Sequence, residues 1–179
     1  MNNYIQRGIP FGESRQYVNK TQSQLNRIFE IDSRTLSDSL TGWVVSKGRF
    51  GGWNGRCPLC SVFKSKHRSR DKNYMPAYLY PGNDKGYQEG FIFHCCACET
   101  TLTTYQFLKE VQGISTAEKY AQERWDAGQL CGQGWNCPLP SKEYRRESYR
   151  RAEQERKARN YQKKYGSSPT ESAEHPRDQ

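Results

Sequence analysis

The sequence has no hydrophobic run long enough to cross a membrane, because no stretch approaches 18 apolar residues. Apolar residues are scarce throughout: only 34% of the 179 residues are hydrophobic, and the formal net charge is +9. Such a chain cannot bury a large core along its whole length. A membrane-spanning protein is therefore excluded, and we expect one small ordered domain with polar appendages.

Residues for the commonest catalytic sites are also missing. No Asp-x-Asp pair is present to hold magnesium for phosphoryl transfer, and no Gly-x-x-x-x-Gly-Lys-Ser/Thr loop is present to bind ATP. Histidine occurs only three times, without a nucleophile motif beside it. The sequence therefore contains no recognisable catalytic set, and whether the chain is part of an enzyme stays open.

Cysteine, in contrast, is present in an informative pattern. Cys-Pro-Leu-Cys occupies residues 57–60, and Cys-Cys-Ala-Cys occupies residues 95–98. A Cys-x-x-Cys pair places two thiolates on one tight turn, and two pairs supply the four soft ligands of a tetrahedral zinc site. We therefore predict that one structural Zn²⁺ is bound, without an open coordination position, by Cys57, Cys60, Cys95 and Cys98.

The two pairs are separated by 34 residues, which is long for a minimal finger and suits a zinc ribbon with an insertion between its knuckles. The alternatives are a disulfide framework and a redox pair. Seven cysteines is an odd number, and the N-terminus lacks the basic and apolar regions of a secretion signal. Neither pair has the strand-to-helix context of a redox motif. We expect a reduced, cytoplasmic protein.

Other potential ligands fit the zinc site less well. His67 lies outside knuckle spacing, whereas His94 and Cys96 are nearer alternatives. The residues at i and i+3 of a knuckle converge on the metal, so we expect Cys96 to point away. Cys131 and Cys137 lack two further ligands, and we expect them to be free thiols.

The chain is expected to have three parts: a polar arm with short helices (1–42), a zinc-ribbon domain followed by two helices (43–140), and a basic tail that is helical and then disordered (141–179). The predicted fold is a small α+β zinc ribbon, a three-stranded antiparallel sheet flanked by short helices. Its strands are expected near 53–56, 75–80 and 91–93, where aromatic and apolar residues alternate. A further short strand is expected at 43–45.

Three capping boxes predict where helices begin: Thr21-x-x-Gln24, Thr103-x-x-Gln106 and Ser115-x-x-Glu118. Residues 142–165 also favour a helix, but they contain no apolar stripe. They carry ten Lys and Arg against four Glu, so much of the net positive charge is concentrated there.

A basic loop beside aromatic strands indicates a surface for single-stranded nucleic acid. Cations release counterions from phosphates, and aromatic side chains stack on exposed bases. The candidate contacts are Lys64, Lys66, Arg68, Arg70, Lys72, Tyr74 and Tyr78. The alternative is a solvated basic surface beside ordinary sheet aromatics.

Residues 43–112 resemble the N-terminal zinc-binding domain of DNA primases, especially those of large tailed phages. The resemblance is carried by Gly-Arg-Cys-Pro-Leu-Cys at 55–60, the basic stretch, the aromatic strand, and Phe-His-Cys-Cys-Ala-Cys at 93–98. Tyr-Gln-Phe-Leu-Lys-Glu at 105–110 fills the place of the helix that follows in that family. Ser61 departs from the family, which often has glycine there.

The resemblance implies that the four knuckle cysteines bind zinc and that basic residues contact the single-stranded template during RNA primer synthesis. It also implies contacts with the replicative helicase in a primosome, in the host cytoplasm for a phage protein. The family's polymerase core and its acidic magnesium site have no counterpart here. We therefore expect a DNA-binding primase component, with catalysis supplied by another chain. The alternative is a regulatory or protein-interaction module that docks on a replication or transcription enzyme without contacting DNA.

Overall fold

The computed structural model describes residues 20–45, 52–60, 75–81 and 90–166. The chain divides into two compact units, Met1–Pro140 and Ser141–Gln179. The first contains a β-sheet and three α-helices, and the second contains one long helix. The α+β class predicted from the sequence is confirmed. Within the described residues, none of the helices combines the length and the apolar character that a membrane span needs.

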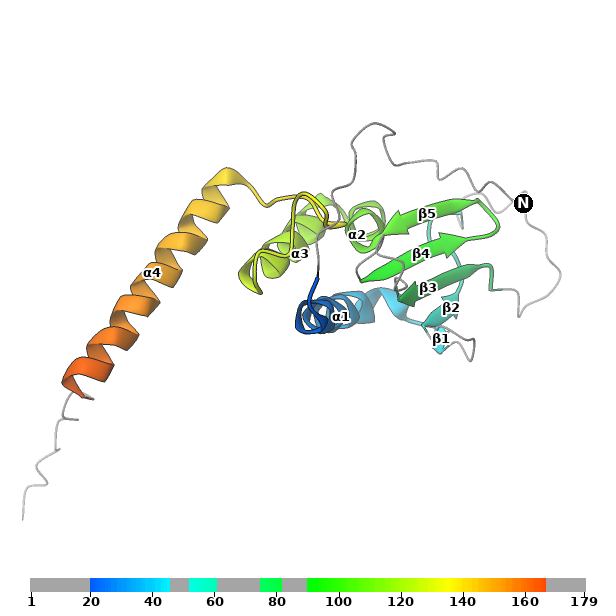
Figure 1. Cartoon of the computed structure of the whole chain (residues 1–179). Coiled ribbons are helices and arrows are strands. Elements are labelled where there is room, and N and C mark those ends of the chain that lie inside the picture. The colour runs from blue at the N-terminus through cyan, green and yellow to red at the C-terminus, as the bar shows by residue number, and fades with distance from the viewer. Residues whose placement is uncertain (1–19, 46–51, 61–74, 82–89, 167–179) are drawn as a thin grey trace, which may run out of the picture. The chain divides into compact units, whose positions relative to one another are not determined.

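The sheet of the first unit has five antiparallel strands in the order in which they occur along the chain (Figure 1). They are β1 (Val44–Val45), β2 (Trp53–Gly55), β3 (Ala77–Pro81), β4 (Phe91–Cys95) and β5 (Thr100–Thr103).

This sheet has two more strands than the three predicted for the ribbon itself. The expected strand at 43–45 pairs with β2 and so belongs to the same sheet, and β5 was not predicted. The sequence of β5 is Thr-Thr-Leu-Thr, whose β-branched residues suit a strand, but it lacks the apolar alternation by which strands are recognised.

The described residues of the first unit also form three α-helices and one 3₁₀ turn. They are α1 (Gln22–Leu36), η1 (Ser37–Leu40), α2 (Thr104–Gln112) and α3 (Ile114–Asp126). The capping boxes at Thr21 and Thr103 are both formed, as predicted. The prediction of a cap at Ser115 is wrong. Gly113, with φ of 95°, ends α2 and starts α3, so Ser115 already lies inside the helix.

Aromatic side chains join the sheet to the helices. The ring of Phe93 on β4 lies 4.8 Å from that of Phe107 on α2 and 6.4 Å from that of Trp43. Phe91, two residues earlier on the same face, packs edge-on against Phe29 of α1 at 5.7 Å. Burial of such rings is the main stabilising contribution available to a chain with few apolar residues. The sheet that carries the cysteine turns is therefore held against α1 and α2.

The second unit is α4 (Lys142–Tyr165), which matches the predicted helix at 142–165. The Ser141 hydroxyl accepts a hydrogen bond from the Tyr144 amide at 3.1 Å, and Gly166 ends the helix. None of its residues is buried. The predicted disorder near the C-terminus falls on residues 167–179, outside the described part of the chain.

Candidate metal centre

The first cysteine turn follows β2 directly. Cys57 and Cys60 lie at the two ends of a tight turn, and Cys57 is buried. The backbone amide of Cys60 donates a hydrogen bond to the Cys57 sulfur, with a distance of 3.4 Å. An amide aimed at sulfur stabilises a thiolate more than a neutral thiol. This turn therefore prepares its first cysteine to act as an anionic ligand.

The second turn connects β4 to β5. Cys95 is the last residue of β4, and Cys98 lies two residues before β5 begins. Glu99 takes a positive φ of 53°, which completes the reversal of the chain. The amide of Cys96 donates to the carbonyl of Pro76 at 2.9 Å, and its side chain is exposed. Cys96 thus faces solvent, as the i, i+3 rule for knuckles predicts.

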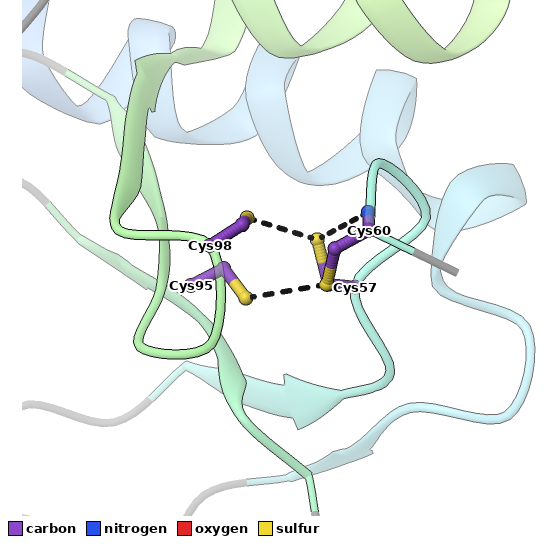
Figure 2. A group of neighbouring side chains, drawn as sticks. All are labelled: Cys57, Cys60, Cys95 and Cys98. Atoms are coloured by element: carbon purple, nitrogen blue, oxygen red, sulfur yellow. Dashed lines mark hydrogen bonds between the residues drawn. The ribbon is translucent and has the colours of Figure 1, made fainter. Parts of the chain in front are cut away.

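The two turns face each other and bring their four sulfur atoms together (Figure 2). All four Sγ atoms lie within 4.8 Å of one another. The Cys57 and Cys98 sulfurs are 3.8 Å apart, and the Cys60 and Cys95 sulfurs are 3.9 Å apart. A tetrahedron with zinc–sulfur bonds of about 2.3 Å has sulfur–sulfur edges of about 3.8 Å. The donor set and its size therefore suit zinc.

The thiols of this cluster are difficult to ionise without a cation. Burial raises the pKa of Cys57 and of Cys60 to about 11, and that of Cys95 to about 12. Burial acts in the same direction on Cys98, but hydrogen bonds from Thr100 and the neighbouring thiols lower its pKa overall. Like charges at these distances repel strongly. A bound divalent cation would remove that cost, so the cluster gains most from metal binding.

The alternative ligands do not join the cluster. His94, beside Cys95, directs its Nδ1 to the Thr101 hydroxyl on β5, with a distance of 2.9 Å. Within the described part of the chain, one group of at least three potential ligands is present, and it consists of the four knuckle cysteines alone. His67 falls outside the described residues.

Most of the predicted nucleic-acid contacts also fall outside the described residues. These are Lys64, Lys66, Arg68, Arg70, Lys72 and Tyr74. Tyr78 lies on β3, where its side chain is 38% exposed, while its neighbours Ala77 and Leu79 are fully buried. In the sheet register Tyr78 lies between Asn54 and His94. It is thus an accessible aromatic ring on the solvent face of the sheet.

Two buried clusters were missed by the sequence analysis. Asp32 on α1 is fully buried and accepts hydrogen bonds from α3 and from the sheet, through Tyr120 and the Phe91 amide. Cys131 and Cys137, which we expected to be free thiols, form no disulfide, but both are buried and their sulfurs lie only 3.7 Å apart. Asp32 lies four residues from both Ile28 and Leu36, on the buried face of α1, and a charge at that position is the sequence signal that could have indicated it.

Comparison of the chain with known protein families, with curated proteins and with solved structures found no match in any of the three.

Proposed function

We propose that this chain is a zinc-ribbon protein in which Cys57, Cys60, Cys95 and Cys98 bind one structural Zn²⁺. The observation that carries the proposal is the convergence of four sulfurs within 4.8 Å from two separate turns. Four thiolates fill the tetrahedral coordination of zinc, so the ion would stabilise the fold and would not activate water. It would fix the turn after β2 against the turn between β4 and β5.

We further propose that the zinc ribbon binds single-stranded template DNA as one component of a phage DNA primase. The resemblance of residues 43–112 to primase zinc domains supports this role, as does the net positive charge. The exposed ring of Tyr78 offers a stacking surface on the strand that follows the basic segment. A separate polymerase chain and the replicative helicase would be its partners, in the host cytoplasm.

The test combines metal analysis with single-strand binding. The purified chain should contain one zinc ion, and it should bind a labelled single-stranded oligonucleotide with an affinity that falls steeply as salt rises. Tyr78→Ala should weaken binding by the equivalent of one stacked base, about 1–3 kcal/mol. Tyr161→Ala is the control, because Tyr161 is 62% exposed but belongs to α4 and not to the sheet.

Three outcomes would count against the proposal. Absence of stoichiometric zinc from a folded protein would remove its basis. Absence of single-strand binding at low salt, with zinc present, would reject the template role and favour the protein-interaction alternative. Equal effects of Tyr78→Ala and Tyr161→Ala would reject the sheet as the stacking surface.

A further inference from the structure

The basic residues of α4 are gathered on one half of the helix surface. At about 100° per residue, nine of its ten Lys and Arg side chains fall within one half of the circumference. We call this half the basic face. It consists of Lys142, Arg145, Arg146, Arg150, Arg156, Lys157, Arg159, Lys163 and Lys164.

Acidic residues are concentrated on the opposite half. Glu143, Glu147 and Glu155 all lie there, together with a single basic residue, Arg151. Glu153 is the exception on the basic face, and its carboxylate is paired with two cations of that face. Arg156 lies 3.0 Å from it and Lys157 lies 3.5 Å from it. The asymmetry therefore separates a strongly cationic side of the helix from a weakly anionic one.

The helix is organised to form without a packed apolar face. Ser141 caps its start, and the pairs Arg150–Glu147 and Arg156–Glu153 link successive turns. Glu143 in the first turn and Lys163 and Lys164 in the last complement the helix dipole. The helix backbone thus places the cations along one half of its surface before any partner binds.

We propose that the basic face of α4 binds the phosphate backbone of double-stranded DNA. The helix is about 36 Å long at 1.5 Å per residue, and duplex DNA carries one negative charge per about 1.7 Å of its axis. A face of nine cations along a helix of this length matches a rigid, regularly charged polyanion. The major groove of B-DNA admits an α-helix, whereas that of an RNA duplex is too narrow.

Other partners fit the same helix less well. A helix that lies on an anionic membrane needs an apolar face, and the half opposite the basic face carries three Glu and three Tyr side chains but no Leu, Ile, Val, Met or Phe. A helix dimer needs an apolar seam, which is missing in α4 for the same reason. A flexible single strand would gain less from cations that are spaced along a rigid helix. This duplex contact is distinct from the single-strand contact proposed for the zinc ribbon and does not depend on it.

The test uses two variants of the full chain with equal net charge. The first, Arg146→Gln/Arg159→Gln/Lys163→Gln, removes three charges from the basic face. The second, Arg151→Gln/Gln154→Glu/Gln162→Glu, lowers the net charge by the same amount on the opposite half. All the new residues are good helix formers, so circular dichroism should show equal helix content. Affinity for a labelled DNA duplex is measured by anisotropy across a range of salt concentrations.

In the first variant, the slope of log affinity against log salt concentration should become less steep by about three, one for each phosphate contact removed. The second variant should keep nearly the whole slope. Equal losses in both variants would show an effect of net charge alone and would overturn the proposal, as would an unchanged slope in the first.

Two further probes test the partner itself. If the unmodified protein bound phosphatidylserine vesicles more tightly than the duplex, its partner would be a membrane and the proposal would be overturned. The proposal would also be overturned if the first variant lost as much affinity for single-stranded DNA as for the duplex. Single-strand binding that survives in this variant, with duplex binding lost, supports two separate contacts. Failure of the zinc-ribbon proposal would instead appear as absent single-strand binding with duplex binding intact.

Discussion

The carboxylate of Asp32 accepts a hydrogen bond from the hydroxyl of Tyr120 at 2.6 Å, although 88 positions separate these residues in the chain. The same carboxylate accepts the Phe91 amide and the Thr104 hydroxyl, each at 2.8 Å. The Arg124 guanidinium in turn donates to the Tyr120 hydroxyl at 3.0 Å. One buried acid therefore ties α1 to α2, α3 and the strand that leads into the second cysteine turn.

Replacing this acid should destabilise the first unit. Asp32→Ala leaves the buried Phe91 amide and the Tyr120 hydroxyl without their acceptor, and each unsatisfied group costs about 1–3 kcal/mol. We expect the free energy of unfolding to fall by about 3 kcal/mol, measured by urea denaturation. Glu30→Ala, at an exposed position of the same helix, should change it by less than about 0.5 kcal/mol. Similar losses for both variants would contradict a special role for the buried carboxylate.

Gly90 is required by the same carboxylate. Its φ is +83°, and a Cβ atom built on it would lie 2.0 Å from the Asp32 Oδ2 atom. Gly90→Ala must therefore move Asp32 or the strand, and we expect a loss of more than about 3 kcal/mol from strain and broken hydrogen bonds together. Gly113 also has a positive φ, +95°, but a Cβ there meets nothing within 4 Å.

Gly113→Ala is consequently the matched control, and it should cost only the backbone strain, about 1–3 kcal/mol. Thermal and urea unfolding of the two variants side by side separate the steric contribution from the conformational one. If Gly113→Ala destabilised the protein more than Gly90→Ala, the close approach of Gly90 to Asp32 would be unimportant for stability.

The parts of this fold that local rules govern could be predicted from sequence. Thr21 and Thr103 each exchange hydrogen bonds with the Gln three positions later and so cap the start of their helix. The sequence signal for each helix start therefore lies within four residues. Alternation along β3 puts Leu79 and Tyr78 on opposite faces of the sheet, and the structure buries the first and exposes the second. The spacing within each cysteine pair likewise indicated which sulfurs converge.

The remaining features depend on contacts between distant segments. Nothing near Asp32 in the sequence indicates that its carboxylate will accept hydrogen bonds from Phe91, Thr104 and Tyr120. The proximity of Cys131 and Cys137 depends on a loop reversal, in which the Gly132 amide donates to the Cys137 carbonyl at 2.8 Å. Such pairings are set by tertiary packing, and a single sequence carries no periodic signal for them.

Adjacent cysteines give a sharp test of the metal centre. Cys95→Ser should remove one ligand, so that the zinc content falls well below one ion per chain and the ribbon loses its structure, since structural zinc contributes directly to folding. Cys96→Ser changes the exposed neighbour and should leave both zinc content and unfolding midpoint unaltered. Mass spectrometry under native conditions reads the metal directly. Zinc loss in Cys96→Ser, with retention in Cys95→Ser, would reverse the assignment of ligands.

Zinc affinity should rise with pH over an unusually wide range. Burial raises the pKa values of Cys57 and Cys60 to about 11 and that of Cys95 to about 12, so these thiols carry protons at neutral pH. Zinc must displace those protons, and each one released makes the affinity rise about tenfold per pH unit. The rise should therefore continue past about pH 9, where the affinity of a site with ordinary thiols levels off. Competition with a chelator of known proton affinity measures it, and an affinity that levels off at about pH 9 or below would contradict the raised pKa values.

Cys131 and Cys137 should resist alkylation in the folded protein. They are 6% and 2% exposed, and the Cys131 thiol donates a hydrogen bond to the carbonyl of Ala121 at 3.2 Å. Cys96 is exposed and should react with iodoacetamide as soon as the reagent is added. Peptide mass mapping of briefly treated zinc-bound protein should find the label on Cys96, and on Cys131 and Cys137 only after urea is added. Rapid labelling of this pair in native buffer would show that the loop after α3 opens readily and that its buried packing does not persist in solution.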